Sequence, residues 1–189
     1  VGPTTRASGV KKDVRQDHPY SAYADMNIKA ITPDVFSGEV NGDVYDRIIV
    51  RLLEVKQSVE IIEYCVNNLP DGDILSEKKL AKLLATLKKA TGEGIGRHEA
   101  PRGEVIHYVK LGEGEAPEVW KARAPTYNNL MPWVPMLKNQ EVADIPIVIA
   151  SIDPCIGCMD RVTLVDSSTY KKEILTRDQL RKLSVEKTR

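Results

Sequence analysis

The longest regular pattern in the chain is VYDRIIVRLLEVKQSVEIIEYCVNNL, residues 44–69. Its apolar residues recur at steps of three and four, which places them on one face of an α-helix. These residues are Val44, Ile48, Leu52, Val55, Val59, Ile62, Val66 and Leu69. The Pro70-Asp71-Gly72 sequence that follows ends a helix, because proline cannot continue the hydrogen-bond ladder and glycine permits a turn. The spacing predicts one helix of about seven turns.

Less regular segments flank this helix. Residues 1–43 are punctuated by Gly and Pro turn signals, and we expect a loop-rich stretch that lies on other structure. A second helix is expected from about Ser76, a possible N-cap, with four leucines on one face: Leu80, Leu83, Leu84 and Leu87. Three glycines at 92, 94 and 96 then lead into segments 104–110 and 118–123. These two segments predict an antiparallel β-hairpin around a Gly-Glu-Gly turn.

The last third of the chain mixes short elements. Two prolines, Pro132 and Pro135, make residues 126–138 a broken helix or a loop. Residues 145–152 are strongly apolar and predict a buried strand or helix that leads residues 153–158 into the interior. A strand pair at 162–165 and 172–175 and a helix from Thr176 are expected to follow. The fold class predicted is α+β and mainly helical, with long core helices and a β-hairpin.

Composition excludes several classes of protein. The 189 residues are enough for one domain, or one piece of a larger one. Lys plus Arg and Asp plus Glu both number 27, so no long-range positive field favours nucleic acid. The longest apolar run is far shorter than the roughly 20 residues that span a bilayer. Three cysteines and no signal-peptide pattern indicate the cytoplasm.

A pair of cysteines, Cys155 and Cys158, has the spacing that lets two sulfurs face one soft metal. The alternatives are a redox dithiol or two buried small residues. A zinc site of four cysteines within the chain is excluded, because only Cys65 remains, and Cys65 is expected to be a core residue. The apolar run before the pair favours burial and therefore metal, with further ligands from outside this chain.

A second cluster is the sequence HEAPRGE, residues 98–104. Its arginine, Arg102, is expected either to neutralise Glu99 or Glu104 in a buried pair or to direct a fixed charge at a site. The three histidines, His18, His98 and His107, have no ligand spacing among themselves and are not expected to bind metal.

Taken in order, a series of short blocks through most of the chain resembles the large subunits of energy-converting nickel-iron hydrogenases. The blocks are GPTTRASG at 2–9, DHPY at 17–20, NGDVYDR at 41–47, EAPRGE at 99–104, KARAP at 121–125 and DPCIGCMDR at 153–161. The quinone-site subunit of respiratory complex I shares the scaffold, but those relatives lack the cysteines of the last block. The resemblance thus implies that the chain is the C-terminal part of a hydrogenase large-subunit fold.

The same resemblance implies roles for five residues. Cys155 would be a terminal nickel ligand and Cys158 a bridge between nickel and iron, in a centre whose iron carries diatomic ligands. Arg102, with Pro101 before it, matches the arginine over the open face of the metal pair, and Asp153 matches a carboxylate that orients it. Arg102, Pro101 and Asp153 are therefore the expected catalytic group.

The resemblance also implies an activity and partners. The expected reaction is reversible heterolytic cleavage of hydrogen, with electrons passing to iron-sulfur clusters in a small subunit and energy coupled to ion translocation by membrane subunits. The other two cysteine ligands would lie in an N-terminal half or a separate chain, so this chain is not expected to be active alone. It would be a peripheral oxidoreductase subunit on the cytoplasmic face of the membrane.

Three questions stay open at this level. The scaffold also fits a sulfur-reducing membrane oxidoreductase, or a metal-free quinone-site or structural subunit in which the cysteines are vestigial. The expected division is a large-subunit part at residues 1–161 and a C-terminal extension at 162–189, and the extension is either removed on maturation or retained.

Overall fold

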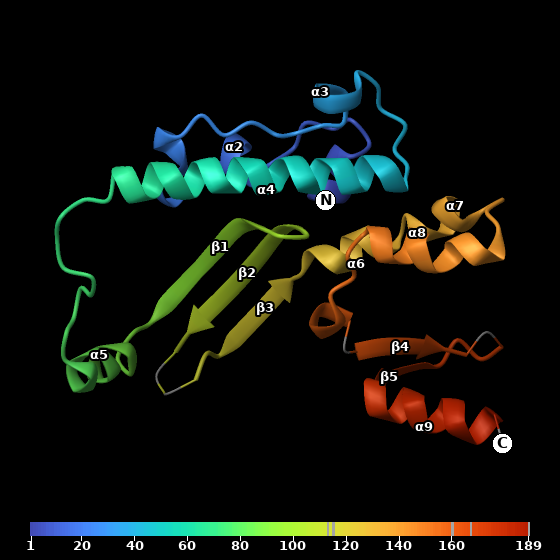
Figure 1. Ribbon diagram of the computed structural model, residues 1–189. Coiled ribbons are helices and arrows are strands. Elements are labelled where there is room, and N and C mark those ends of the chain that lie inside the picture. The colour runs from blue at the N-terminus through green and yellow to red at the C-terminus, as the bar shows by residue number, and fades with distance from the viewer. Residues whose placement is uncertain (113, 115, 160, 167, 189) are drawn as a thin grey trace.

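A computed structural model describes residues 1–112, 114, 116–159, 161–166 and 168–188. Its central element is α4, Val44–Asn67, which spans the molecule in Figure 1. The Asp43 side chain caps its N-terminus by accepting a hydrogen bond from the Asp46 amide. The helix predicted from the spacing is confirmed within two residues at its C-terminal end.

The N-terminal segment runs along α4 (Figure 1). It contains single turns of helix: α1 Pro3–Arg6, α2 Val14–Asp17, the 3-10 helix η1 Ser21–Asp25 and α3 Asp34–Ser37. Despite its loop-rich sequence, it supplies much of the buried interior, including Thr4, Arg6, Val14 and Thr32. The interior beside α4 is therefore rich in polar and charged groups.

A three-stranded antiparallel sheet lies beneath α4, in the order β1 Gly92–Ala100, β2 Gly103–Leu111, β3 Val119–Arg123. The hairpin β2–β3 was predicted, but β1 was not. Glycine-rich β1 has no apolar alternation, and it is a strand because it pairs with β2 through a two-residue turn at Pro101 and Arg102. This turn carries a predicted site residue.

The helices that follow the sheet lie against one end of α4. They are α6 Pro125–Leu130, α7 Trp133–Leu137, the 3-10 helix η2 Val142–Asp144, α8 Ile145–Ser151 and the 3-10 helix η3 Ile156–Met159. Helix α8 contacts α4, and α6 contacts both β2 and η3. The broken helix expected at 126–138 is confirmed, and residues 145–151 are helix rather than strand. Pro146 sits in the first turn of α8, where proline is tolerated.

Two parts of the chain stand away from this body in Figure 1. One is α5, Leu80–Leu87, which begins at Lys79 as N-cap and not at Ser76 as expected. The other comprises β4 Arg161–Val165, β5 Lys172–Thr176 and α9 Arg177–Thr188, close to the predicted strand pair and helix. The α+β class is thus observed. Long core helices were expected, but among the described residues only α4, with 24 residues, and α9, with 12, exceed eight residues.

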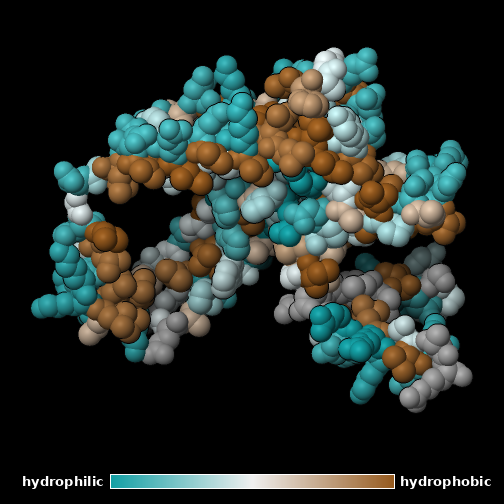
Figure 2. Space-filling model, in the orientation of Figure 1, coloured by the Kyte–Doolittle hydropathy of each residue, from teal (hydrophilic) through white to brown (hydrophobic). Residues whose placement is uncertain are grey.

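The apolar face of α4 is not buried in this chain. Leu52 is 61% exposed, and Val55, Val59 and Ile62 are similarly open. Figure 2 shows the resulting hydrophobic band along the lower side of the helix. Cys65 is exposed as well, so its assignment to the core was wrong for this chain. The periodicity identified the helix but not what covers its apolar face.

Candidate functional site

The predicted site residues meet where the β1–β2 turn faces the segment after α8. Arg102 binds Asp153 twice: its Nε donates to the Asp153 carbonyl oxygen at 2.7 Å and its Nη2 to Oδ1 at 3.0 Å. The guanidinium plane is therefore fixed in two directions. Of the two alternatives for Arg102, the pairing with Glu99 or Glu104 is not observed, because Glu99 binds Arg6 and Glu104 binds Arg97 and Arg123.

Backbone geometry on both sides holds this clamp. Asp153 has a φ of +55°, a left-handed conformation that turns the chain out of α8. Gly103 has a φ of +121°, and a Cβ atom there would lie 2.7 Å from the Gly2 nitrogen. A Cβ on Gly2 would meet the Gly103 Cα at less than van der Waals distance. The turn that carries Arg102 is thus packed backbone to backbone against the N-terminal segment.

Helix α6 supplies two supporting side chains that sequence reasoning missed. Asn129 Nδ2 donates to the Arg102 carbonyl oxygen at 3.1 Å, and Thr126 Oγ1 accepts from the Cys155 amide at 3.3 Å. Both side chains are about 1% exposed. The available signal was their position in the sequence, since Pro125, the last residue of the KARAP block, opens the helix that carries them. Helix α6 links the arginine and the cysteines.

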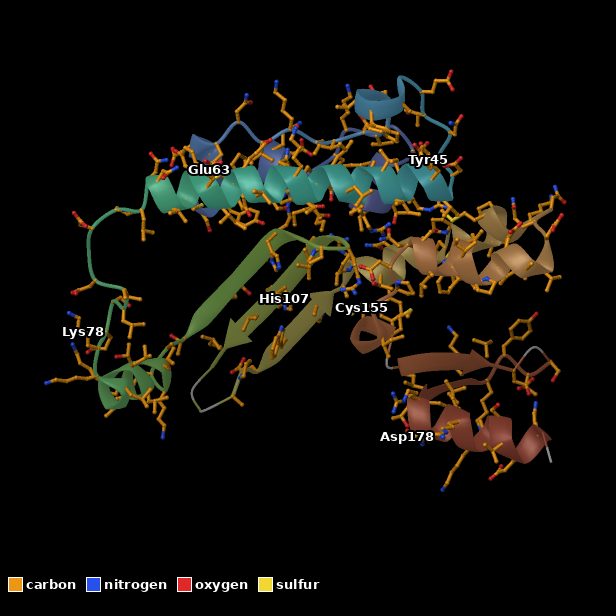
Figure 3. The ribbon with its side chains drawn as sticks, in the orientation of Figure 1. Tyr45, Glu63, Lys78, His107, Cys155 and Asp178 are labelled. Atoms are coloured by element: carbon orange, nitrogen blue, oxygen red, sulfur yellow. The ribbon has the colours of Figure 1, made fainter. Side chains whose placement is uncertain are left out.

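Cys155 directly precedes η3 and Cys158 lies within it, and Cys158 N donates to the Cys155 carbonyl oxygen at 3.1 Å. Both side chains are partly exposed, so the expectation that residues 153–158 enter the interior was wrong. Figure 3 shows Cys155 beside the end of the sheet, near α6. The pair lies at an open edge, because α8 ends at Ser151 and leaves the following turn uncovered.

The surroundings of the two cysteines shift their pKa values in opposite directions. The Cys158 thiol and backbone lower the pKa of Cys155, and the charge of Arg102 acts in the same direction. Burial, together with the hydrogen bond to Cys155, raises the pKa of Cys158. The pKa of Cys155 is therefore below that of Cys158, so Cys155 is the first of the two thiols to lose its proton.

The described residues contain no group of three or more His, Cys, Asp or Glu side chains suited to a metal ion. Two adjacent sulfurs, one with a lowered pKa, nevertheless form a soft donor pair. The pair suits half of a thiolate ligand set, so a metal held here needs further ligands from outside these residues.

A buried charge cluster adjoins the clamp. Arg6, 1% exposed, donates from Nε to Glu54 Oε1 at 2.6 Å and from Nη1 to Glu99 Oε1 at 2.9 Å. It also lies 3.3 Å from Asp13, which is held by Arg15. A cavity of about 370 Å³ lies between this cluster and Asp153.

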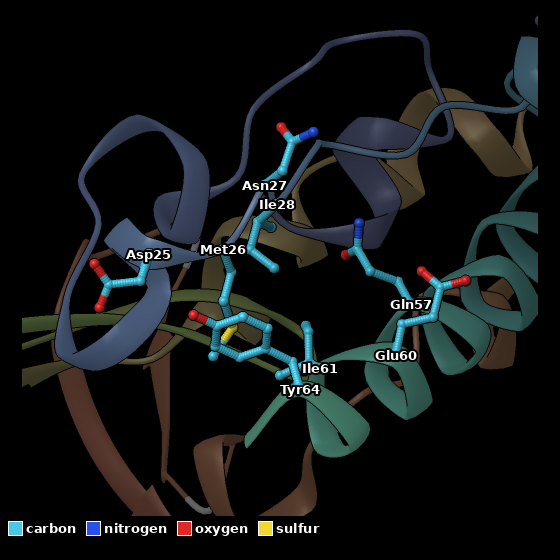
Figure 4. A pocket seen from close by; sticks show the side chains of 8 residues that line it. All are labelled: Asp25, Met26, Asn27, Ile28, Gln57, Glu60, Ile61 and Tyr64. Carbon is cyan, nitrogen blue, oxygen red and sulfur yellow. The ribbon is translucent and has the colours of Figure 1, made fainter. Parts of the chain in front are cut away.

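A smaller cavity of about 210 Å³ lies at the C-terminal half of α4 (Figure 4). Gln57, Ile61 and Tyr64 line it from the helix, opposite residues 25–28. It contains none of the predicted site residues. Of the predicted site residues, Pro101 and Asp153 line the cavity of about 370 Å³.

Comparison with known proteins adds a family. Residues 1–161 match the family model of the respiratory-chain NADH dehydrogenase 49-kDa subunit. The chain is 46% identical to the membrane-bound hydrogenase subunit alpha of Pyrococcus furiosus, over all of this chain and 44% of that protein. It is 34% identical to formate hydrogenlyase subunit 5 of Escherichia coli, over 99% of this chain and 31% of that one.

A third relative has a different name. It is a subunit of the NADH-quinone oxidoreductase of Roseiflexus, 36% identical over 85% of this chain and 42% of its own length. The chain thus spans less than half the length of these relatives. Both hydrogenase subunits and quinone oxidoreductase subunits are its homologues.

Proposed function

This chain belongs to the family of the respiratory-chain NADH dehydrogenase 49-kDa subunit, and we propose that its function is that of the hydrogenase subunits in this family. In this proposal it is the part of a nickel-iron hydrogenase large subunit that supplies Cys155 and Cys158 to the metal centre. The observation that carries the proposal is the sulfur pair beside Arg102. The 46% identity to a protein named as a hydrogenase subunit supports it.

The two sulfurs suit a nickel-iron centre as half of its ligands. Thiolates select soft metals, and a sulfur with a lowered pKa is available without a strong base. Cys155 would be a terminal ligand and Cys158 a bridging one. The other two cysteines would come from the part of the relatives that this chain does not span.

Arg102 would act on charge that develops beside the sulfurs. When bound, the centre would supply the redox and Lewis-acid chemistry that splits hydrogen heterolytically. Arg102 holds a permanent cation at the site, and its two hydrogen bonds to Asp153 keep the guanidinium in place throughout. Pro101 restricts the turn, and Thr126 fixes the Cys155 amide. Cys155 is the group that takes up or releases the proton.

The partners follow from what this chain leaves uncovered. The exposed apolar band on α4 favours coverage by another protein surface, and we assign it to the part that carries the other cysteines. Among the described residues no helix is both long and apolar enough to cross a membrane. Because relatives are named as subunits of a membrane-bound hydrogenase and of an NADH-quinone oxidoreductase, we propose a peripheral subunit on the cytoplasmic face of a membrane complex. In this proposal it passes electrons to an iron-sulfur subunit and couples to membrane ion-translocating subunits.

We also propose that residues 162–189 form an extension beyond the large-subunit part. In support, β5 packs with β4 and α9 into a small unit of its own. Whether the tail is cleaved can be read from the mass of the mature subunit.

The second candidate is a metal-free quinone-site or structural subunit. The similarity to the NADH-quinone oxidoreductase subunit of Roseiflexus favours it. In that case Cys155 and Cys158 would be vestigial. Reduction of sulfur compounds on the same scaffold stays an alternative prediction.

The test is nickel and iron content per chain in the purified full-length complex. We expect about one nickel in the wild type and its loss in Cys155→Ser and Cys158→Ser. The matched control is Cys65→Ser, an exposed cysteine on α4, which should keep its nickel. An assembled wild-type complex without nickel would refute the proposal and favour the metal-free subunit.

A further inference from the structure

The strand β1 leaves its outer edge unpaired, at the margin of the sheet in Figure 1. Glu99 N donates to the Tyr20 hydroxyl at 3.1 Å, so the Glu99 backbone points away from β2. Backbone groups alternate in direction along a strand, so the N–H and C=O groups of Glu93, Ile95 and Arg97 point the same way. Among the described residues, no hydrogen bond from another segment reaches these three backbones. A further strand can therefore pair with β1 along this edge.

The side chains along this edge leave it open. Gly94 and Gly96 are exposed, and a Cβ atom added to either would meet nothing within 4 Å. Ile95 is 74% exposed. The register with β2 is continuous along the strand, so no bulge turns the edge away from a partner. The charged residues of the edge are Glu93 and Arg97, which repel a strand of like charge and attract one of opposite charge.

The sequence of this edge is complementary to its own reverse. It reads Glu93-Gly94-Ile95-Gly96-Arg97. When a second copy runs antiparallel about a two-fold axis at Ile95, each Glu93 lies opposite the Arg97 of the other copy and the two Ile95 side chains lie opposite each other. The glycines also lie opposite each other, so no bulky side chain separates the strands there. Opposite-charge pairs and apolar pairs directly across an antiparallel ladder are stabilising.

Backbone and side chains favour the same register. The three residues whose backbones point outward meet one another across the axis, so about six hydrogen bonds can form. A shift of two residues toward the turn would set Glu93 opposite Glu99, where like charges repel. Glu93 accepts from the Tyr108 hydroxyl through Oε2 at 2.6 Å, which leaves Oε1 for a second donor. Arg97 lies 3.2 Å from Glu104 through Nε and is 34% exposed, which leaves the end of its guanidinium for a second carboxylate.

We propose that β1 pairs with β1 of a second copy of this chain and joins the two sheets into one. The interface is isologous, because residues 93–97 of both copies meet across a two-fold axis at Ile95. Two ion pairs between Glu93 and Arg97, related by this axis, set the register. The pairing uses the edge of the sheet and not the apolar band of α4, so it is compatible with the partner assigned to that band. It does not depend on the proposed metal centre.

The test measures the mass of the full-length subunit by light scattering over a range of concentrations. We expect a dimer for the wild type. Glu93→Arg or Arg97→Glu sets like charges opposite each other on both sides of the axis, so the dissociation constant should rise at least about tenfold. The double variant with both changes restores the pairs between copies but not the contacts with Tyr108 and Glu104 within the chain, so it should recover the dimer. The matched control is Lys121→Glu, an exposed charge reversal on β3, which should leave the mass unchanged.

A second variant tests the backbone pairing. The Ile95 N–H points away from β2, so Ile95→Pro removes a hydrogen bond between copies and none within the sheet. It should abolish the dimer, and the amides of Glu93 and Arg97 should then exchange rapidly with solvent. A wild-type subunit that stays monomeric would overturn the proposal, including one in which slow exchange shows that another segment of the subunit covers this edge. A double charge variant that stays monomeric would overturn the antiparallel register and with it the proposal.

Discussion

Replacing Arg6 by methionine tests the charge cluster that holds the N-terminal segment to α4 and β1. Methionine keeps an unbranched side chain but removes the cation. Glu54 would lose the partner at 2.6 Å and Glu99 the one at 2.9 Å. The Lys12 carbonyl oxygen would lose a donor at 2.9 Å as well. Uncompensated carboxylates would remain in a largely buried site.

The expected cost follows from burial. Removing one partner of a buried ion pair costs about 3–5 kcal/mol. The lower end applies here, because Arg15 stays bound to Asp13 at 2.6 Å and Glu54 reaches solvent. We expect Arg6→Met to lower the free energy of unfolding by about 3 kcal/mol. Burial already raises the pKa of Glu54, and without the cation of Arg6 this folded-state pKa rises further. The deficit should therefore shrink as pH falls and protonation removes the buried charge of Glu54.

The assay is urea unfolding of the full-length subunit, followed by tryptophan fluorescence at several pH values. The control is Arg97→Met, which breaks a 3.2 Å contact with Glu104 from a side chain that is 34% exposed. Such a pair contributes about 0–1 kcal/mol. The reasoning would be refuted if Arg6→Met cost no more than Arg97→Met, or if its deficit grew in acid.

Three further predictions concern the hairpin that carries Arg102. Gly103→Ala should lower the free energy of unfolding in urea by at least about 1–3 kcal/mol, because Gly103 has a φ of +121° and the added Cβ would lie 2.7 Å from the Gly2 nitrogen. The control is Gly96→Ala, whose added Cβ meets nothing within 4 Å, so its effect should be small. Arg102→Lys keeps the positive charge but loses the two guanidinium hydrogen bonds to Asp153. Hydrogen turnover should therefore fall about 100-fold at unchanged nickel content. Turnover equal to that of the wild type would show that Arg102 is only structural. Burial acts to raise the pKa of Glu104, but the hydrogen bond and charge of Arg123 lower it below the usual 4.5. Its contribution to stability is therefore present above that pH and lost as pH falls, so Glu104→Gln should flatten the acid loss of stability measured by unfolding below about pH 5.

Several features of the fold could be predicted from sequence because their causes are local. The three-and-four spacing, the Asp43 cap and the Pro70 stop together determine α4 within a few residues. Strand β1 escaped prediction because Gly92, Gly94 and Gly96 leave it without a side-chain pattern. It is a strand only through its pairing with β2.

The candidate site was predicted in part. Cys155, Cys158 and Arg102 stood out as residue types with metal and anion chemistry. The residues that support them did not, because Asn129 is 27 residues from Arg102 and Thr126 is 29 residues from Cys155. Small polar residues of this kind carry no signal until the fold brings them close.

By itself, the sequence determined the long helix, the β2–β3 hairpin and the spacing of the cysteine pair. Only the tertiary structure decided which carboxylate each arginine meets. Arg102 turned away from Glu99 and Glu104 to Asp153, 51 residues away, and Arg6 took Glu99, 93 residues away. The physical reason is that helix periodicity acts between neighbours along the chain, whereas charges pair through space wherever the fold buries them together.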